Sequence, residues 1–138
     1  MSKIFFYGLF MDQSLLTAKG LHPQSVGPAA LFGYRIHIGE RATLLQSESN
    51  RAYGIVMKLT EPEARTLYAE PSVREYKPER VTVELLENNT VVEVDCYILP
   101  RELGLAGANP EYAKKLARLV ESLHFDPAYV REITAFGV

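Results

Sequence analysis

An uninterrupted apolar run near the start of the chain constrains its fold more than any other feature. Residues 4–11 are apolar or aromatic apart from one glycine, and Asp12 ends the run. The run is aromatic rather than rich in Leu and Ala, and no small-x-small cleavage site follows it directly, so it differs from a secretory signal. A transmembrane helix needs about 18 to 20 uninterrupted apolar residues, which no stretch of the chain offers. The run therefore predicts a buried first strand over residues 3–8.

The length of the chain suits one well-packed domain. Its 138 residues are 47% hydrophobic, and a chain of this length hides roughly two-thirds of its unfolded surface on folding. We therefore expect a single domain over residues 1–138 that needs no structural metal. Cys96 is the only cysteine, so no internal disulfide can form, which predicts a reducing, cytoplasmic location.

The charge balance bears on the kind of partner. With 15 Lys and Arg against 17 Asp and Glu, the formal net charge is −2. Such a charge provides no field that would gather phosphates or anionic lipid. A small molecule is therefore the expected partner, rather than a nucleic acid or a membrane surface.

Capping residues mark four helix starts. They are Asp12, with Gly20 at the helix end; Thr60 with Glu63, a capping box for a helix over residues 61–69; Asn109–Pro110; and Asp126–Pro127. The helix after Asn109 carries apolar residues on one face only, as expected for a helix that packs against a core.

Strand patterns alternate with these helices. Alternating apolar residues predict five strands after the first one, at residues 29–38, 41–46, 53–59, 80–87 and 91–98. The last two are joined by a tight turn at Asn88–Asn89. The sum is an α+β chain of about six short strands and three or four helices. Short connections between antiparallel strands favour a small barrel or a strongly curled sheet with helices outside.

Neither a metal site nor a cofactor is predicted. His22, His37 and His124 are widely spaced, and no C-x-x-C or H-x-x-x-H motif accompanies them. Cys96 shares a strand face with Val94, which favours a small buried filler over a nucleophile. The chain also lacks the glycine-rich loops that bind nucleotides.

The segment Tyr7–Met11 is the first candidate for binding. A buried strand meets Gly8 there and a helix begins near Asp12, so several backbone amides can point outward without a partner. Such a turn binds a carboxylate well. The alternative is that Gly8 only permits a tight strand-to-helix turn.

Glu70 is the candidate for chemistry. Pro71 disfavours the helical conformation at Glu70, which places this carboxyl at the C-terminal end of the predicted helix. The helix macrodipole disfavours negative charge there, an environment that suits a general acid or base working near neutral pH. The alternative is a solvated glutamate at a frayed helix end.

In their order along the chain, these segments resemble the gamma-glutamylcyclotransferase-like superfamily, in particular its small bacterial-type avirulence-induced-gene-like branch. Its members open with a strand that ends in Tyr-Gly-[Ser/Thr]-[Asn/Leu]-[Leu/Met], which Tyr7, Gly8 and Met11 match. Further matches span nearly the whole chain: Gly33-Tyr34-Arg35, Gly54–Leu59, the capped helix before Glu70, Tyr76 before Val81-Thr82-Val83, Tyr97, and the Pro-x-Tyr segments at 110–112 and 127–129.

The resemblance implies a small mixed, mainly antiparallel β-barrel with flanking helices. It also implies a cyclotransferase that acts on a γ-glutamyl amine or amino acid, releases 5-oxoproline through attack of the substrate's own α-amine, and uses no metal or cofactor. Glu70 would be the catalytic general acid/base. The substrate-binding residues would be Tyr7, Gly8, Leu9, Phe10, Met11, Tyr76 and Tyr97.

Three residues depart from the family's pattern. Leu9 stands where Ser or Thr is usual, Phe10 where Asn or Leu is usual, and Pro71 where a glycine usually follows the Glu. The backbone amide at position 9 remains, but the hydroxyl of the usual Ser or Thr is lost. Proline at position 71 removes the backbone N–H of that residue. Two alternatives stay open: Glu75 as the catalytic carboxylate, and a non-catalytic small-molecule-binding protein on the same fold.

Overall fold

The computed structural model describes residues 1–138 and contains five strands that close into a barrel. The strands are β1 (Ser2–Phe6), β2 (Gln24–Ile38), β3 (Ala42–Leu59), β4 (Lys77–Leu85) and β5 (Val91–Ile98). Around the barrel they follow the order β1-β3-β2-β4-β5. The β1–β5 pair, with Ile4 opposite Asp95, is parallel and the other pairs are antiparallel, so the barrel is mixed and mainly antiparallel as expected.

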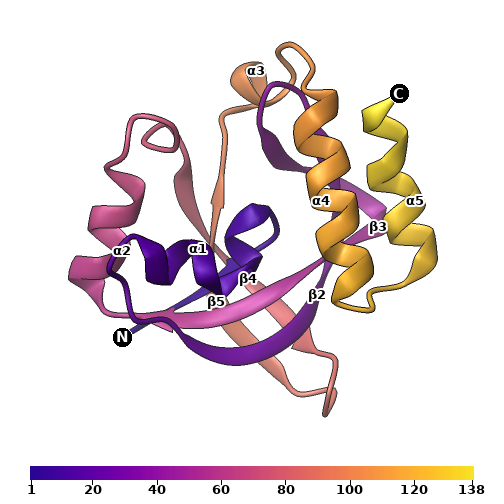
Figure 1. The fold of residues 1–138 in the computed structure, drawn as a ribbon. Coiled ribbons are helices and arrows are strands. Elements are labelled where there is room, and N and C mark those ends of the chain that lie inside the picture. Colours follow the sequence, from indigo (N-terminus) through magenta and orange to yellow (C-terminus); the bar gives the residue numbers. More distant parts are fainter.

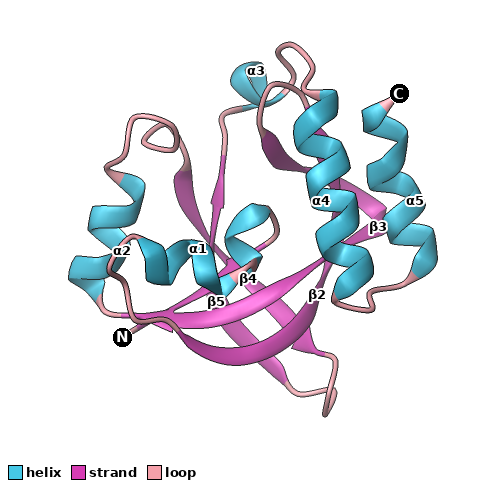
Figure 2. Cartoon of the chain, in the orientation of Figure 1, coloured by secondary structure: helices cyan, strands magenta, loops and turns pink.

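Helices lie outside the barrel (Figures 1 and 2). They are α1 (Gln13–Ala18), α2 (Glu61–Tyr68), α3 (Arg101–Gly104), α4 (Pro110–Ser122) and α5 (Pro127–Thr134), with single 3₁₀ turns η1 (Leu9–Met11) and η2 (Ala135–Gly137). In Figure 1, α4 and α5 pack side by side, away from α1 and α2. None of the helices combines the length and the apolar character needed to cross a membrane.

Side-chain caps confirm the four predicted helix starts. Thr60 Oγ1 accepts a hydrogen bond from the Glu63 N–H, and the Glu63 carboxylate accepts one from the Thr60 N–H, so the capping box is complete. At the other three starts a side-chain oxygen accepts from an amide two or three residues further on; these residues are Asp12, Asn109 and Asp126. The caps satisfy amides that the first helical turn leaves without partners.

The strands are fewer than the sequence patterns predict, and β2 and β3 are longer, whereas β1 ends at Phe6 rather than at residue 8. β3 runs unbroken for 18 residues and covers both predicted strands at 41–46 and 53–59. The polar stretch between them is mostly exposed and has no alternation of apolar and polar residues, so the sequence predicted no strand there. Residues at its two ends, Gln46 and Arg51, nevertheless pair with β2.

The predicted beginning of the second strand, at residue 29, is also corrected. β2 begins at Gln24 and continues through Gly27 and Pro28, residues that usually interrupt a strand, with a shift in its pairing register between Ser25 and Gly27. Gly27 there has a φ of 144°, a conformation that residues with a side chain rarely adopt. The one-turn helix α3, which has no side-chain cap, was not predicted either.

One apolar cluster of 34 buried residues fills the barrel and the space beneath the helices. Phe5 and Val56 come from β1 and β3, and Leu16 and Leu116 come from α1 and α4. Cys96 is fully buried in this cluster, as predicted. Burial raises the pKa of its thiol well above the ordinary value, which removes its nucleophilic form.

Candidate active site

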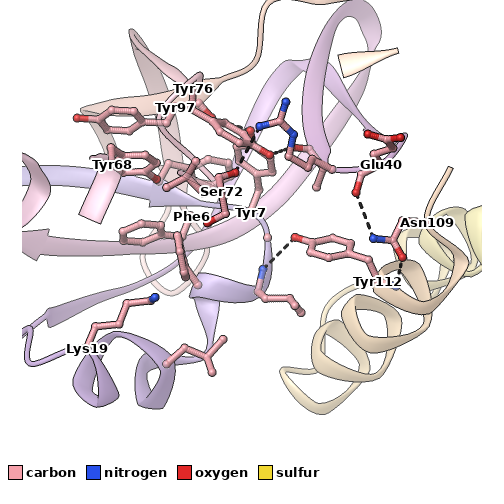
Figure 3. Close-up of a pocket in the computed structure, with 18 of the residues that line it drawn as sticks. Phe6, Tyr7, Lys19, Glu40, Tyr68, Ser72, Tyr76, Tyr97, Asn109 and Tyr112 are labelled. Carbon is pink, nitrogen blue, oxygen red and sulfur yellow. Dashed lines mark hydrogen bonds between the residues drawn. The ribbon is translucent and has the colours of Figure 1, made fainter. Parts of the chain in front are cut away.

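A cavity of about 610 Å³ opens on one side of the barrel (Figure 3). Segments far apart in the sequence line it: the end of β1 with the following turn and α1, residues 40–42, residues 68–76, Tyr97, and the start of α4. Most of the lining side chains are apolar or aromatic. The volume and this lining are typical of a site for a small organic molecule.

The β1–α1 turn, Tyr7–Asp12, forms one wall. Within it the N–H groups of Met11 and Asp12 donate to the carbonyls of Gly8 and Leu9. No hydrogen bond within the molecule engages the N–H of Tyr7 or Gly8. The turn thus offers backbone donors beside the cavity, an arrangement that suits a bound carboxylate.

The structure brings most of the predicted substrate-binding residues to the cavity. The lining residues among them are Tyr7, Gly8, Leu9, Phe10, Tyr76 and Tyr97. Met11 is not among the lining residues; its side chain is 3% exposed and belongs to the core. It anchors the turn from below instead of facing the cavity.

Tyr112, on the first turn of α4, also reaches the β1–α1 turn, although it was not among the predicted substrate-binding residues. Its hydroxyl accepts a hydrogen bond from the Leu9 N–H at 3.3 Å, and Figure 3 shows the ring extending from the helix to this nitrogen. A Cβ added at Gly8 would lie 2.6 Å from that hydroxyl. Gly8 is therefore needed here for close approach as well as for the turn.

Two other cavity tyrosines use their hydroxyl protons inside the molecule. Tyr7 donates to the Tyr97 carbonyl and Tyr76 donates to the Ala42 carbonyl, both at 2.6 Å. The ring of Tyr97 stacks on that of Tyr68, with centroids 3.6 Å apart. Burial is the main cause that raises the pKa of the Tyr7 and Tyr76 hydroxyls, so both stay neutral at physiological pH.

Glu70, the predicted catalytic carboxylate, lies at the edge of the cavity rather than in its lining. Both of its carboxylate oxygens accept hydrogen bonds from Lys19 Nζ, at 2.9 and 3.0 Å. Lys19 itself lines the cavity, next to α1. About a third of each of these two side chains is exposed. The ammonium group thus places a positive charge beside a carboxylate at the negative end of the α2 dipole.

Glu75, the alternative carboxylate, has a similar position on the other side. Its carboxylate pairs with Arg41 at 2.9 Å, and Arg41 lines the cavity. This arginine is also held by the Ser72 carbonyl, at 3.3 Å, and lies over the ring of Tyr76, 5.8 Å from its centroid. Glu75 thus belongs to a network of several contacts.

Glu40 is the one carboxylate among the lining residues, and sequence reasoning did not select it. Its backbone is fixed on both sides, because its N–H donates to the Ala106 carbonyl at 2.8 Å and its carbonyl accepts from Asn109 Nδ2 at 3.2 Å. Its side chain lies against Gly107 and is exposed. The only sequence signal was its place in the turn between two predicted strands.

No group of three or more His, Cys, Asp or Glu side chains lies close enough together to hold a metal ion. The charged groups that line the cavity are Lys19, Glu40 and Arg41. Together with the turn amides and the tyrosine hydroxyls, they suit a small molecule that carries both an anionic and a cationic group.

The comparisons with known proteins agree with this fold. The model of the family described as "Gamma-glutamyl cyclotransferase, AIG2-like" matches residues 4–123. The chain therefore belongs to the AIG2-like gamma-glutamyl cyclotransferase family, and the resemblance found in its sequence is confirmed. A search of curated proteins finds no significant match.

Solved structures of low sequence identity share the fold. A gamma-glutamyl cyclotransferase is 16% identical, with a TM-score of 0.78 over 97% of this chain and 86% of the other. YkqA from Bacillus subtilis is 21% identical, with a TM-score of 0.79 over 99% of this chain and 54% of the other. An uncharacterized protein from Homo sapiens is 18% identical, with a TM-score of 0.74 over 97% and 86% of the two chains. These likenesses confirm the predicted barrel with flanking helices.

Proposed function

We propose that this protein is a cyclotransferase that converts a γ-glutamyl amine or amino acid into 5-oxoproline and a free amine. The α-amine of the γ-glutamyl group attacks its own γ-carbonyl carbon, a C–N bond of the lactam forms, and the C–N bond to the leaving amine breaks. The nucleophile and the electrophile belong to one molecule, so proximity in the bound substrate contributes much of the acceleration. The reaction needs no metal, no cofactor and no nucleophile from the protein.

The observation that carries this proposal is the cavity over the β1–α1 turn. The N–H groups of Tyr7 and Gly8 have no partner within the molecule, and we assign them to an anionic oxygen of the substrate, either the α-carboxylate or the oxyanion that forms at the γ-carbon. The cavity has room for a γ-glutamyl group with its leaving amine. Membership of the gamma-glutamyl cyclotransferase family supports the same reaction.

Glu70 is the proposed general acid/base. It takes the proton that the α-ammonium loses and passes it to the leaving amine. To do so its carboxylate turns from Lys19 Nζ into the cavity, a rotation of a partly exposed side chain. Only a flexible lysine holds Glu70, whereas Glu75 pairs with an arginine that has three partners. This difference favours Glu70 over Glu75.

One observation favours a second function, a non-catalytic binding protein. The Glu70 carboxylate is engaged by Lys19 and does not line the cavity. A protein that kept this arrangement with ligand bound would hold a γ-glutamyl compound without converting it. Leu9 and Pro71, where the family has other residues, point in the same direction.

The test is release of 5-oxoproline from a panel of γ-glutamyl amino acids and γ-glutamylated amines. We expect turnover of at least one panel member and a loss of about 100-fold or more in kcat for Glu70→Gln, as removal of a general acid/base causes. A panel member that raises the melting temperature of the wild type but is never converted would establish the binding protein instead.

A further inference from the structure

The Tyr112 hydroxyl lies at the β1–α1 turn and donates no hydrogen bond within the molecule. Its hydroxyl contacts the turn at two residues, by the hydrogen bond from Leu9 and by the close approach to Gly8. In the bond with Leu9 the hydroxyl oxygen is the acceptor, because a backbone N–H can only donate. No other hydrogen bond of the molecule involves this hydroxyl.

Other tyrosines of the molecule show the contrast. Tyr7, Tyr76 and Tyr129 each donate their hydroxyl proton to a backbone carbonyl. Their hydroxyls hold the fold together, whereas the Tyr112 proton remains available in the cavity. The oxygen of Tyr112 already accepts from Leu9, and its proton is free to bond with a ligand at the turn.

The position of Tyr112 is fixed by a helix cap, and its hydroxyl stays protonated. The Asn109 side chain caps the helix by accepting from the Tyr112 N–H at 3.1 Å, so the ring starts from the first turn of α4. Burial raises the pKa of its hydroxyl to about 12, so it is a protonated donor at neutral pH. Leu9, the side chain at the same point of the turn, has no hydroxyl.

We propose that the Tyr112 hydroxyl donates a hydrogen bond to the α-carboxylate of the bound γ-glutamyl group, beside the free amides of Tyr7 and Gly8. The identity of this ligand rests on the proposed function. Tyr112 is then a substrate-binding residue that supplies, from a helix 103 residues away along the chain, the side-chain donor that position 9 lacks. A charged acceptor makes such a bond stronger than one between neutral groups.

Two small ligands test the contact without any need for turnover. 5-Oxoproline carries the carboxylate, and pyrrolidin-2-one is the same lactam without it. We expect the wild type to bind 5-oxoproline more tightly than pyrrolidin-2-one in calorimetric titrations, and Tyr112→Phe to weaken 5-oxoproline by about tenfold or more while pyrrolidin-2-one is unaffected. Tyr129→Phe, which removes a buried hydroxyl outside the cavity, is the matched control and leaves both affinities unchanged.

The kinetic counterpart is a rise in KM with little change in kcat for Tyr112→Phe, since the carboxylate is charged in the ground state and in the transition state alike. The inference is overturned if the wild type shows no preference for 5-oxoproline, if Tyr112→Phe keeps that preference undiminished, or if Tyr112→Phe lowers kcat alone. If the wild type converts no substrate yet Tyr112→Phe reduces the preference by about tenfold, the proposed catalysis fails and the Tyr112 contact stands.

Discussion

The two sides of the cavity are built differently. On the hairpin side, defined by residues 39–42 with Glu75 and the loop 104–109, backbone groups are tied across the fold by several hydrogen bonds. The α1 side consists of α1, the loop that follows it as far as His22, and Glu70. There, a single ion pair between Lys19 and Glu70 connects the cavity wall to the segment after α2. Figure 3 shows Lys19 and Glu40 at opposite edges of the cavity. The comparison teaches that Glu70, the carboxylate proposed for proton transfer, lies on the side with fewer hydrogen bonds between segments.

The largest expected effect separates the two carboxylates. Glu70→Gln is expected to lower kcat for 5-oxoproline release by about 100-fold or more, whereas Glu75→Gln changes it by less than about threefold because an exposed ion pair contributes little. Both variants keep the shape of the side chain and remove its charge. Steady-state kinetics on the same substrate decide between them. The opposite ranking would make Glu75 the catalytic residue and reverse the functional meaning of the two sides.

The next effect tests whether the hairpin side is tightly built. A Cβ at Gly39 would lie 2.3 Å from the Ala106 carbonyl oxygen and 2.9 Å from that of Gly104. Because both are backbone atoms, Gly39→Ala is expected to lower the free energy of unfolding by about 2–3 kcal/mol. At Gly20, on the α1 side, a Cβ would meet nothing within 4 Å, and the cost of Gly20→Ala is only the strain of its φ of 83°, about 1 kcal/mol. Urea denaturation measures both, and equal losses would contradict the difference in packing.

The sequence predicted the local features of this site but not the long-range contacts between them. The turn after β1, the capping box and the place of Glu70 after α2 depend on neighbouring residues, so local patterns contain them. The residues that these segments contact in the folded protein lie far away along the chain. Lys19 meets Glu70 across 51 residues and Tyr112 meets Leu9 across 103. Such contacts exist only once the barrel has closed and α4 has packed on it, so no pattern along the chain contains them.

The strand errors have the same origin. β3 continues through an exposed polar stretch because β2 pairs with it at Gln46 and Arg51, and pairing between strands leaves no mark on the periodicity of one strand. Glu40 was missed for a related reason. The sequence places it in a turn between two strands. It lines the cavity because hydrogen bonds with the loop 104–109 hold its backbone there.

A smaller effect compares the two cations. Arg41→Met removes the ion pair with Glu75, the bond to the Ser72 carbonyl and the contact with Tyr76, and is expected to lower the free energy of unfolding by about 1 kcal/mol. Lys19→Met removes one partly exposed ion pair, for an expected loss below about 0.5 kcal/mol. Methionine keeps much of each stem, so packing is matched. Chemical denaturation at low and high salt measures both, and a larger loss for Lys19→Met would overturn the contrast between the two sides.

The smallest effect concerns a further hydrogen bond that ties the α1 side to α2. The Glu63 carboxylate accepts from the His22 N–H at 2.7 Å, in addition to its bond with the Thr60 N–H. These backbone hydrogen bonds, with the Thr60 bond the larger cause, lower the pKa of Glu63 below its ordinary value of 4.5. A carboxyl whose pKa is lower in the folded state adds stability above its unfolded pKa and loses it as the pH falls through the folded one.

Glu63→Gln removes that titration while an amide oxygen remains to accept one bond. We therefore expect the wild type to be more stable than Glu63→Gln near neutral pH, and the difference to shrink as the pH falls below about 4.5. Denaturation midpoints of both proteins across this range give the answer. A difference that stays constant with pH would mean that the charge of Glu63 does not strengthen its bonds to the Thr60 and His22 N–H groups, and the Lys19–Glu70 pair would then be the one ionic contribution on the α1 side.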